Sequence, residues 1–99
     1  MSEDARWFVT VNAASGGGRS RRLWPVLAAA LRAEGVGFEA AVTRERGHGE
    51  ALAAAAVRGG FRRLLAVGGD GTLHETLNGA LDAARPAAAE RLVLAVAPS

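Results

Sequence analysis

The sequence predicts an α/β fold in which a parallel sheet carries helices on both faces. Four short apolar stretches alternate along the chain with three stretches of helical character, and the connections between them are short. Such an alternation is typical of parallel strands joined by helical crossovers. The 99 residues fit one domain, and 49% hydrophobic with 22% charged residues is the composition of a chain that can bury a core. We therefore expect a three-layer, Rossmann-like domain.

The first strand and helix are the clearest elements. Trp7–Val11 is an aromatic and β-branched run that ends at Asn12 and a Gly/Ser cluster, which predicts a strand. Apolar residues then recur with a helical period from about Arg19 to Glu34. Pro25 lies inside this pattern and should kink the helix or delay its start. Gly35 should end the helix.

The later elements are shorter. Gly37–Val42 is a second strand candidate with weaker β-propensity. Gly49–Arg58 is an alanine-rich helix, and the glycine pair after it should end it. Leu64–Val67 is an unbroken apolar run, as expected of a strand buried on both faces. A third helix and a fourth strand are predicted over Thr72–Ala84 and Arg91–Val96.

Polar, glycine-rich loops follow each of the first three predicted strands. They span Asn12–Ser20, Thr43–His48 and Gly68–Glu75. In an open parallel sheet, ligands bind beyond the carboxyl ends of the strands, where these loops would meet. The sequence therefore predicts one binding site built from three loops.

The third loop is the strongest candidate for phosphate chemistry. Gly68 and Gly69 let the backbone turn sharply and admit a phosphate, which the amides of the following helix would face. Asp70 could bind magnesium or act as a base toward a hydroxyl, and a turn-forming aspartate is the alternative. Thr72 and Glu75 have the spacing of a capping box, so capping and ligand contact are both open for them.

The first loop nearly has the pattern of a Walker phosphate loop. Ala13 stands where that pattern has its leading glycine and Arg19 where it has lysine, so we reject a Walker site. A glycine-rich turn with polar donors and nearby arginines remains. A flexible turn with a solvated basic face is the alternative.

The second loop is less specific. Thr43 could hydrogen-bond a nucleotide, and Arg44 or Arg46 could meet phosphate oxygens. A helix cap or solvated loop is the alternative. His74 begins a partial zinc-helix motif, but Asn78 stands where the second histidine should be, so no zinc site is expected.

Composition excludes several classes of protein. The chain has no cysteine, which excludes disulfides and thiolate metal sites and favours a reducing compartment. It has no lysine, which excludes Schiff-base chemistry. A net charge of +2 is too small to indicate a nucleic-acid partner. The acidic start and the lack of a run of ~20 apolar residues predict a soluble, cytoplasmic chain.

Together these residues resemble the diacylglycerol kinase catalytic domain family, which includes bacterial lipid kinases, sphingosine kinases and ceramide kinases. The family's N-P-x-S-G-x-G opening corresponds to Asn12–Gly18, with Ala13 in place of the proline. Its G-G-D-G-T-x-x-E-x-x-N-G string matches Gly68–Gly79 in full. A threonine with a downstream G-H corresponds to Thr43 and Gly47–His48.

The resemblance implies an enzyme that transfers phosphate from Mg-ATP to a lipid hydroxyl, such as that of diacylglycerol. Asp70 would be the catalytic carboxylate, either as base or as organiser of magnesium and phosphate, and no further magnesium ligand is expected here. The residues implied to hold the nucleotide are Asn12, Ser15, Gly16, Gly17, Gly18, Thr43, Gly68, Gly69, Gly71, Thr72 and Glu75. The alternatives are a fragment of an NAD kinase-like enzyme, which shares the G-G-D-G-T turn, and a non-catalytic nucleotide-binding domain.

The resemblance also implies how the work is divided within the whole enzyme. Family members continue past the fourth strand into a β-sandwich domain that accepts the lipid. Residues 1–99 would then be the nucleotide-binding half, truncated before that domain, with little or no activity alone. The choice of lipid, and any peripheral contact with the inner face of a membrane, would come through the missing domain. No oligomeric state is predicted.

Overall fold

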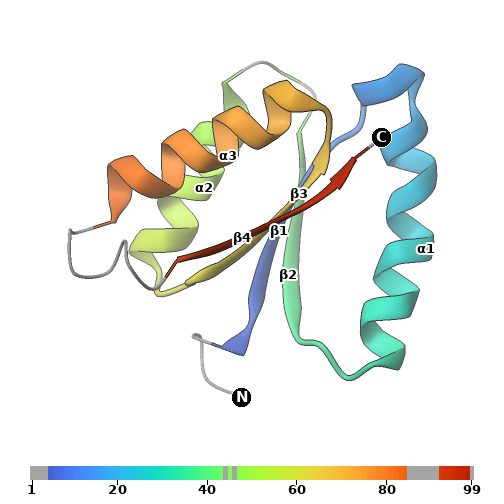
Figure 1. The fold of residues 1–99 in the computed structure, drawn as a ribbon, viewed down its shortest axis with the longest axis horizontal. Coiled ribbons are helices and arrows are strands. Elements are labelled where there is room, and N and C mark those ends of the chain that lie inside the picture. The colour runs from blue at the N-terminus through green and yellow to red at the C-terminus, as the bar shows by residue number, and fades with distance from the viewer. Residues whose placement is uncertain (1–4, 44, 46, 85–91, 99) are drawn as a thin grey trace.

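The structure is a computed structural model that describes residues 5–43, 45, 47–84 and 92–98. It contains a strand, a short 3₁₀ turn and then alternating helices and strands (Figure 1). The elements are β1 (Trp7–Asn12), the 3₁₀ turn (Ser15–Gly17), α1 (Arg19–Ala33), β2 (Phe38–Thr43), α2 (His48–Arg58), β3 (Arg63–Gly68), α3 (Asp70–Ala83) and β4 (Val93–Pro98).

The four strands form one parallel sheet in the order β2-β1-β3-β4. α1 covers one face of the sheet, and α2 and α3 lie against each other on the opposite face (Figure 1). The predicted α/β class with helices on both faces is therefore confirmed. The connection after β1 leads to β2 at one edge of the sheet, and the connection after β3 leads to β4 at the other edge. The order in which strands are added therefore reverses between the central strands β1 and β3. The carboxyl ends of β1 and β3 thus form the switch point at which such sheets bind ligands.

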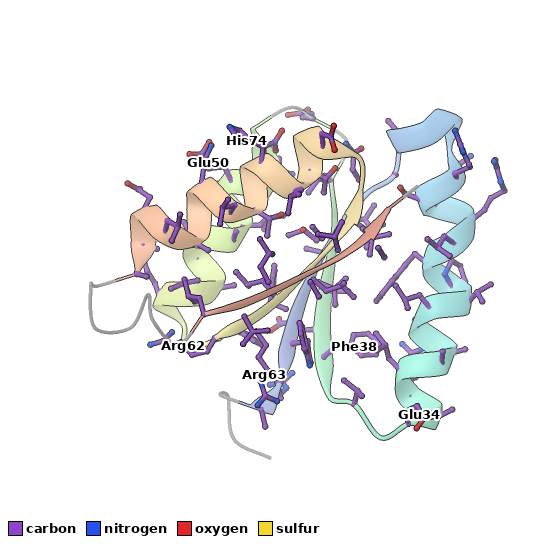
Figure 2. All side chains as sticks on the ribbon, viewed as in Figure 1. Glu34, Phe38, Glu50, Arg62, Arg63 and His74 are labelled. Atoms are coloured by element: carbon purple, nitrogen blue, oxygen red, sulfur yellow. The ribbon has the colours of Figure 1, made fainter. Side chains whose placement is uncertain are left out.

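Alternating residues of the strands build two apolar layers, as the two-residue period of a strand requires. Val9, Val11 and Val67 face α1, and Phe38 of β2 packs on the same side beside Trp24 with ring centroids 5.4 Å apart (Figure 2). The layer under α2 and α3 is formed by Phe8, Ala56, Val57, Phe61, Leu64 and Ala80. Because β3 contributes to both layers, its central residues are buried, as its unbroken apolar run predicts.

The helix ends agree with the glycine signals. Gly35 follows α1 with φ 73°, and its N–H donates to Arg32 O at 3.0 Å, while Val36 N–H donates to Leu31 O at 2.9 Å. This is the Schellman arrangement, which needs a left-handed residue after the helix. Gly60 (φ 110°) ends α2 in the same way.

Two details of the helices differ from expectation. Pro25 does not delay α1, which starts six residues before it. The carbonyl that loses its partner belongs to exposed Arg21, where water can replace the missing N–H donor. α3 starts at Asp70 rather than Thr72, because Gly69 is the N-cap and has extended backbone angles. No helix within the described residues has the length and apolar character needed to cross a membrane.

Candidate functional site

The three polar loops meet at the carboxyl edge of the sheet. Asn12 pairs with Thr43 in the β1–β2 register, and Val11 pairs with Val67, one residue before Gly68. The first two loops are also joined by hydrogen bonds. Ala13 N–H donates to Thr43 O at 3.1 Å, and the buried Thr43 hydroxyl donates to Val11 O at 3.5 Å. The structure therefore brings the ends of the loops together, as the topology predicts.

The first loop is a turn that only glycine can form easily. Gly16, Gly17 and Gly18 have φ values of 63°, 68° and 94° in succession. Non-glycine residues rarely adopt such left-handed angles, and successive amides in these conformations form concave anion-binding turns. Asn12 Oδ1 accepts the Ala14 N–H at 3.1 Å and Arg19 Nε donates to Gly16 O at 3.1 Å, which hold the turn from both sides.

α1 begins with free amides and a concentration of positive charge. Gly18 is its N-cap, no side chain of the described residues caps the first turn, and this turn contains no acidic residue. A Cβ on Gly18 would lie 3.5 Å from Arg22 Nη1 and 4.0 Å from Arg21 Nη2, so two guanidinium groups lie beside the helix start. Cations are unfavourable at a helix N-terminus, whereas an anion there is stabilised by both the amides and the arginines.

The third loop turns sharply because Gly68 packs against Thr72. A Cβ on Gly68 would overlap Thr72 Oγ1 and come within 2.9 Å of Thr72 Cβ, so no other residue fits there without a shift. The capping-box interpretation of Thr72 and Glu75 is wrong. With the N-cap at Gly69, Thr72 lies inside the first turn of α3, and within the described residues no side chain caps that turn.

Asp70 is the first residue of α3, and its side chain is exposed. Within the described residues its carboxylate has no hydrogen-bond or ion-pair partner. Its place at the α3 N-terminus is favourable for an anion. In the part of the chain that the structure describes, no group of three His, Asp or Glu side chains could hold a metal ion.

Two buried hydroxyls lie in the first turns of the helices that start at the switch point. Ser20 Oγ in α1 and Thr72 Oγ1 in α3 are both buried and have no hydrogen-bond partner among the residues that the structure describes. Buried polar atoms are normally paired, so such groups call for a structural or ligand-related explanation. Ser20 ends the predicted loop Asn12–Ser20, but no sequence motif marks it as an individual ligand.

A chain of threonines connects β1 to α3 and was missed from the sequence. Thr76 Oγ1 donates to Thr72 O at 2.8 Å and lies 2.9 Å from Thr10 Oγ1. Because the Thr76 hydroxyl donates its one hydrogen to Thr72 O, the Thr10 hydroxyl is the donor and Thr76 Oγ1 the acceptor of the bond between them. Both hydroxyl-bearing residues are buried, so the first turn of α3 is tied to the central strand. A threonine inside the apolar strand Trp7–Val11 was the available signal.

Glu75 reaches α2 rather than capping its own helix. Its Oε1 accepts the Gly49 N–H at 3.2 Å, at the start of α2. One helical turn later, Gly79 lies directly against the carbonyl of Glu50. Asn78, the neighbour of Gly79, is exposed. Arg44 and Arg46, the other candidates of the second loop, lie outside the described residues.

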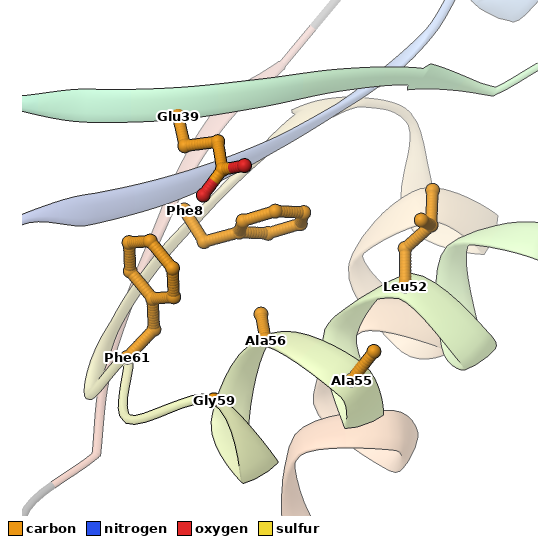
Figure 3. Close-up of a pocket in the computed structure, with 7 residues that line it drawn as sticks. All are labelled: Phe8, Glu39, Leu52, Ala55, Ala56, Gly59 and Phe61. Atoms are coloured by element: carbon orange, nitrogen blue, oxygen red, sulfur yellow. The ribbon is translucent and has the colours of Figure 1, made fainter.

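A separate hollow of about 410 Å³ lies at the other end of the sheet (Figure 3). It is lined by Phe8, Glu39, Leu52, Ala55, Ala56, Gly59 and Phe61. Phe8 and Glu39 are the second residues of their strands, so this hollow is at the amino ends of the strands. It therefore takes no part in the site formed by the three loops.

The sequence model of the diacylglycerol kinase catalytic domain matches residues 6–99. This chain belongs to that family. The family predicted from the motifs is confirmed, which favours the lipid kinase interpretation over the NAD kinase alternative.

Two curated relatives support the same family. The chain is 32% identical over 81 residues to "Putative lipid kinase YtlR" of Bacillus subtilis strain 168, with 79% of this chain and 26% of the relative covered. It is 31% identical over 84 residues to "Sphingoid long chain base kinase 4" of Schizosaccharomyces pombe, with 80% of this chain and 18% of the relative covered. The chain thus spans about a quarter or less of the length of these relatives.

Solved structures share the fold of this family member. Two structures of a protein described as a "putative diacylglycerol kinase" from Bacillus anthracis str. Sterne superpose with TM-scores of 0.70 and 0.68 at 24% identity. The superpositions cover 100% and 98% of this chain, and 32% and 33% of those chains. At this identity, the likeness concerns the fold.

Proposed function

We propose that this chain forms the ATP-binding part of a lipid kinase, which transfers a phosphoryl group from Mg-ATP to a lipid hydroxyl. The observation that carries the proposal is the pairing of two glycine-rich turns at the switch point of the sheet. Each turn leads into a helix without a side-chain cap, and exposed Asp70 begins the second of these helices. Free helix amides and left-handed glycines suit the oxygens of a polyphosphate.

In this proposal the nucleotide phosphates lie between the first and third loops. The amides of Gly16–Gly18 and of Gly69–Thr72 would donate to phosphate oxygens, and Asn12 and Thr43 would close the site on the β2 side. Arg21 and Arg22 would add charge at the α1 end. These groups suit a ligand with several negative oxygens, because they provide many donors and few charges of like sign.

Asp70 would act at the reacting phosphate. Magnesium commonly binds through one or two protein carboxylates together with phosphate oxygens, so a single exposed carboxylate fits a metal that arrives with its nucleotide. When bound, the metal would neutralise charge on the transferred phosphate. Asp70 would orient it or accept the proton of the attacking hydroxyl, and phosphoryl transfer needs mainly such positioning and charge stabilisation.

The lipid would be presented by a part of the enzyme outside residues 1–99. Support comes from the relatives, which are several times longer than this chain and are named as lipid and sphingoid base kinases. On this basis residues 1–99 are a nucleotide-binding half with little activity of its own, and contact with a membrane would be peripheral. A cytoplasmic location stays a prediction. A non-catalytic nucleotide-binding domain is the alternative, and phosphate transfer separates the two.

The proposal is tested by amide NMR of the 99-residue chain titrated with Mg-ATP, with adenosine as the phosphate-free control. We expect shifts confined to the three loops with Mg-ATP and absent with adenosine. A well-dispersed spectrum that is unchanged by Mg-ATP up to millimolar concentration would contradict the proposal. Transfer of phosphate to diacylglycerol or a sphingoid base, and not to NAD, would identify the acceptor class in the intact enzyme.

A further inference from the structure

The helix α2 lacks an N-terminal cap of its own. Its N-cap residue is Gly47 (φ 87°), which has no side chain to accept a hydrogen bond from the first turn. The first amides of a helix have no partner within it, and an uncapped, buried amide is costly. Gly49, whose N–H is one of these, is buried. Some other element must therefore satisfy it.

α3 supplies the missing acceptor through Glu75. Glu75 Oε1 accepts the Gly49 N–H at 3.2 Å, between residues 26 positions apart in the chain. The fit is close, because a Cβ on Gly49 would lie 3.0 Å from Glu75 Oε1. A carboxylate at the start of a helix is also favoured by the helix dipole. Glu75 therefore caps α2 from the neighbouring helix.

Gly79 provides a second point of attachment one turn later along α3. A Cβ there would overlap Glu50 O and lie 3.1 Å from Ala53 Cβ, so the two helix backbones touch at this position. Residues four apart lie on the same face of a helix. Glu75 and Gly79 thus hold α2 at two successive places, and the position of α2 relative to α3 is fixed in both spacing and direction.

This attachment reaches two loops of the candidate site. α2 follows the second loop directly, and Thr43 is only five residues before His48, its first residue. α3 begins with Asp70, five residues before Glu75. We propose that Glu75 is a positioning residue, which holds the second loop in register with Asp70 by capping α2, and that it does not bind the nucleotide. The functional consequence rests on the proposed nucleotide site, whereas the cap itself does not.

The chemistry of the two roles differs in what it needs from residue 75. A cap needs an acceptor oxygen of the same reach, which glutamine also offers. A magnesium or nucleotide ligand acting through its charge needs the carboxylate. Glu75→Gln therefore separates the roles, and Glu75→Ala removes both. Glu50→Gln is the matched control, because it removes a carboxylate from the first turn of α2 at an exposed position (Figure 2).

The experiment measures hydrogen exchange of the Gly49 amide without nucleotide, and Mg-ATP affinity by NMR titration, in the 99-residue chain. For Glu75→Gln we expect both values within about threefold of the unmodified chain, since a neutral acceptor of the same reach still pairs with the buried amide and avoids the cost of an unpaired donor. For Glu75→Ala we expect the exchange rate of the Gly49 amide and the dissociation constant for Mg-ATP each to rise about tenfold or more, because a buried amide loses its partner. Glu50→Gln should leave Gly49 exchange unchanged.

Two results would overturn the inference. One is a Glu75→Gln variant that keeps Gly49 protected but binds Mg-ATP tenfold more weakly, which would make the charge of Glu75 a ligand. The other is Gly49 exchange that is unaffected by any change at residue 75. If Glu75→Ala does not fold, Glu75→Gln still decides between charge and cap. If the unmodified chain ignores Mg-ATP, the nucleotide proposal fails, while Gly49 exchange still tests the cap.

Discussion

Replacing Gly79 by alanine tests how closely α2 and α3 are packed. The added Cβ would overlap Glu50 O, and it would lie 2.9 Å from Glu50 C and 3.1 Å from Ala53 Cβ. The first two atoms belong to the backbone and the third is a methyl carbon, so no side-chain rotation can relieve the contact. The two helices would have to separate locally.

Two opposing effects set the size of the change. Alanine is favoured over glycine inside a helix by about 1 kcal/mol. Overpacking a tight contact typically costs about 1–3 kcal/mol, and contacts with backbone atoms belong at the upper end of that range. The net result is a loss of about 2 kcal/mol in the free energy of unfolding. For a domain of this size, that lowers Tm by about 8–16 °C.

Gly71→Ala is the matched control in the same helix. A Cβ on Gly71 would meet nothing within 4 Å, so alanine adds helix propensity without a collision. We expect Tm to stay the same or to rise by a few degrees, about 1 kcal/mol at most. Thermal and urea unfolding followed by circular dichroism would measure both variants. A Gly79→Ala variant as stable as Gly71→Ala would refute the close crossing of α2 and α3, and with it the second attachment point of the further inference.

Substitutions at three other residues address the site and its support. Thr76→Val should cost about 1–2 kcal/mol of unfolding free energy, because the Thr10 hydroxyl loses its acceptor, and Thr76→Ser should restore most of that stability in urea unfolding. Thr72→Val should leave stability unchanged or raise it, since the buried hydroxyl has no partner in the described part of the chain, while weaker Mg-ATP binding would show that the hydroxyl contacts the ligand. Asp70→Asn should cost at most about 1 kcal/mol of stability, because the side chain is exposed and loses only its interaction with the helix N-terminus, yet abolish phosphate transfer in the intact enzyme. A large loss of stability in Asp70→Asn would instead indicate a structural turn.

The fold was predictable because its signals are local and agree with one another. The apolar run Leu64–Val67 is typical of a strand buried on both faces, and the observed β3 is buried along that run. Gly35 and Gly60 end their helices through left-handed backbone that the chain needs at those points. The meeting of the three loops follows from the parallel topology alone. For these features, the residue types and their spacing in the sequence are enough to predict the geometry.

The features that were missed depend on contacts between segments distant in sequence. The spacing of Thr72 and Glu75 fits a capping box, but the start of α3 is set by the turn at Gly68–Gly69, where Thr72 packs against Gly68. Glu75 finds its partner 26 residues away, and Thr10 is paired with Thr76, 66 residues away. Periodicity within one helix cannot reveal which neighbour each face meets, so these pairs needed the tertiary structure.

These contacts divide the long family motif into two parts with different physical roles. The turn from Gly68 to Thr72 places exposed Asp70 and the first amides of α3 at the sheet edge, where we propose that the nucleotide phosphates bind. The following glutamate and glycine, Glu75 and Gly79, face α2 and hold the helix pair together. A match to the second part therefore reflects the packing of α3 against α2. We expect the same residues in a related domain that keeps this packing but binds no nucleotide. Under the proposed nucleotide site, only the first part bears on catalysis, and Asp70→Asn in the intact enzyme, rather than the length of the motif match, distinguishes a kinase from a non-catalytic relative.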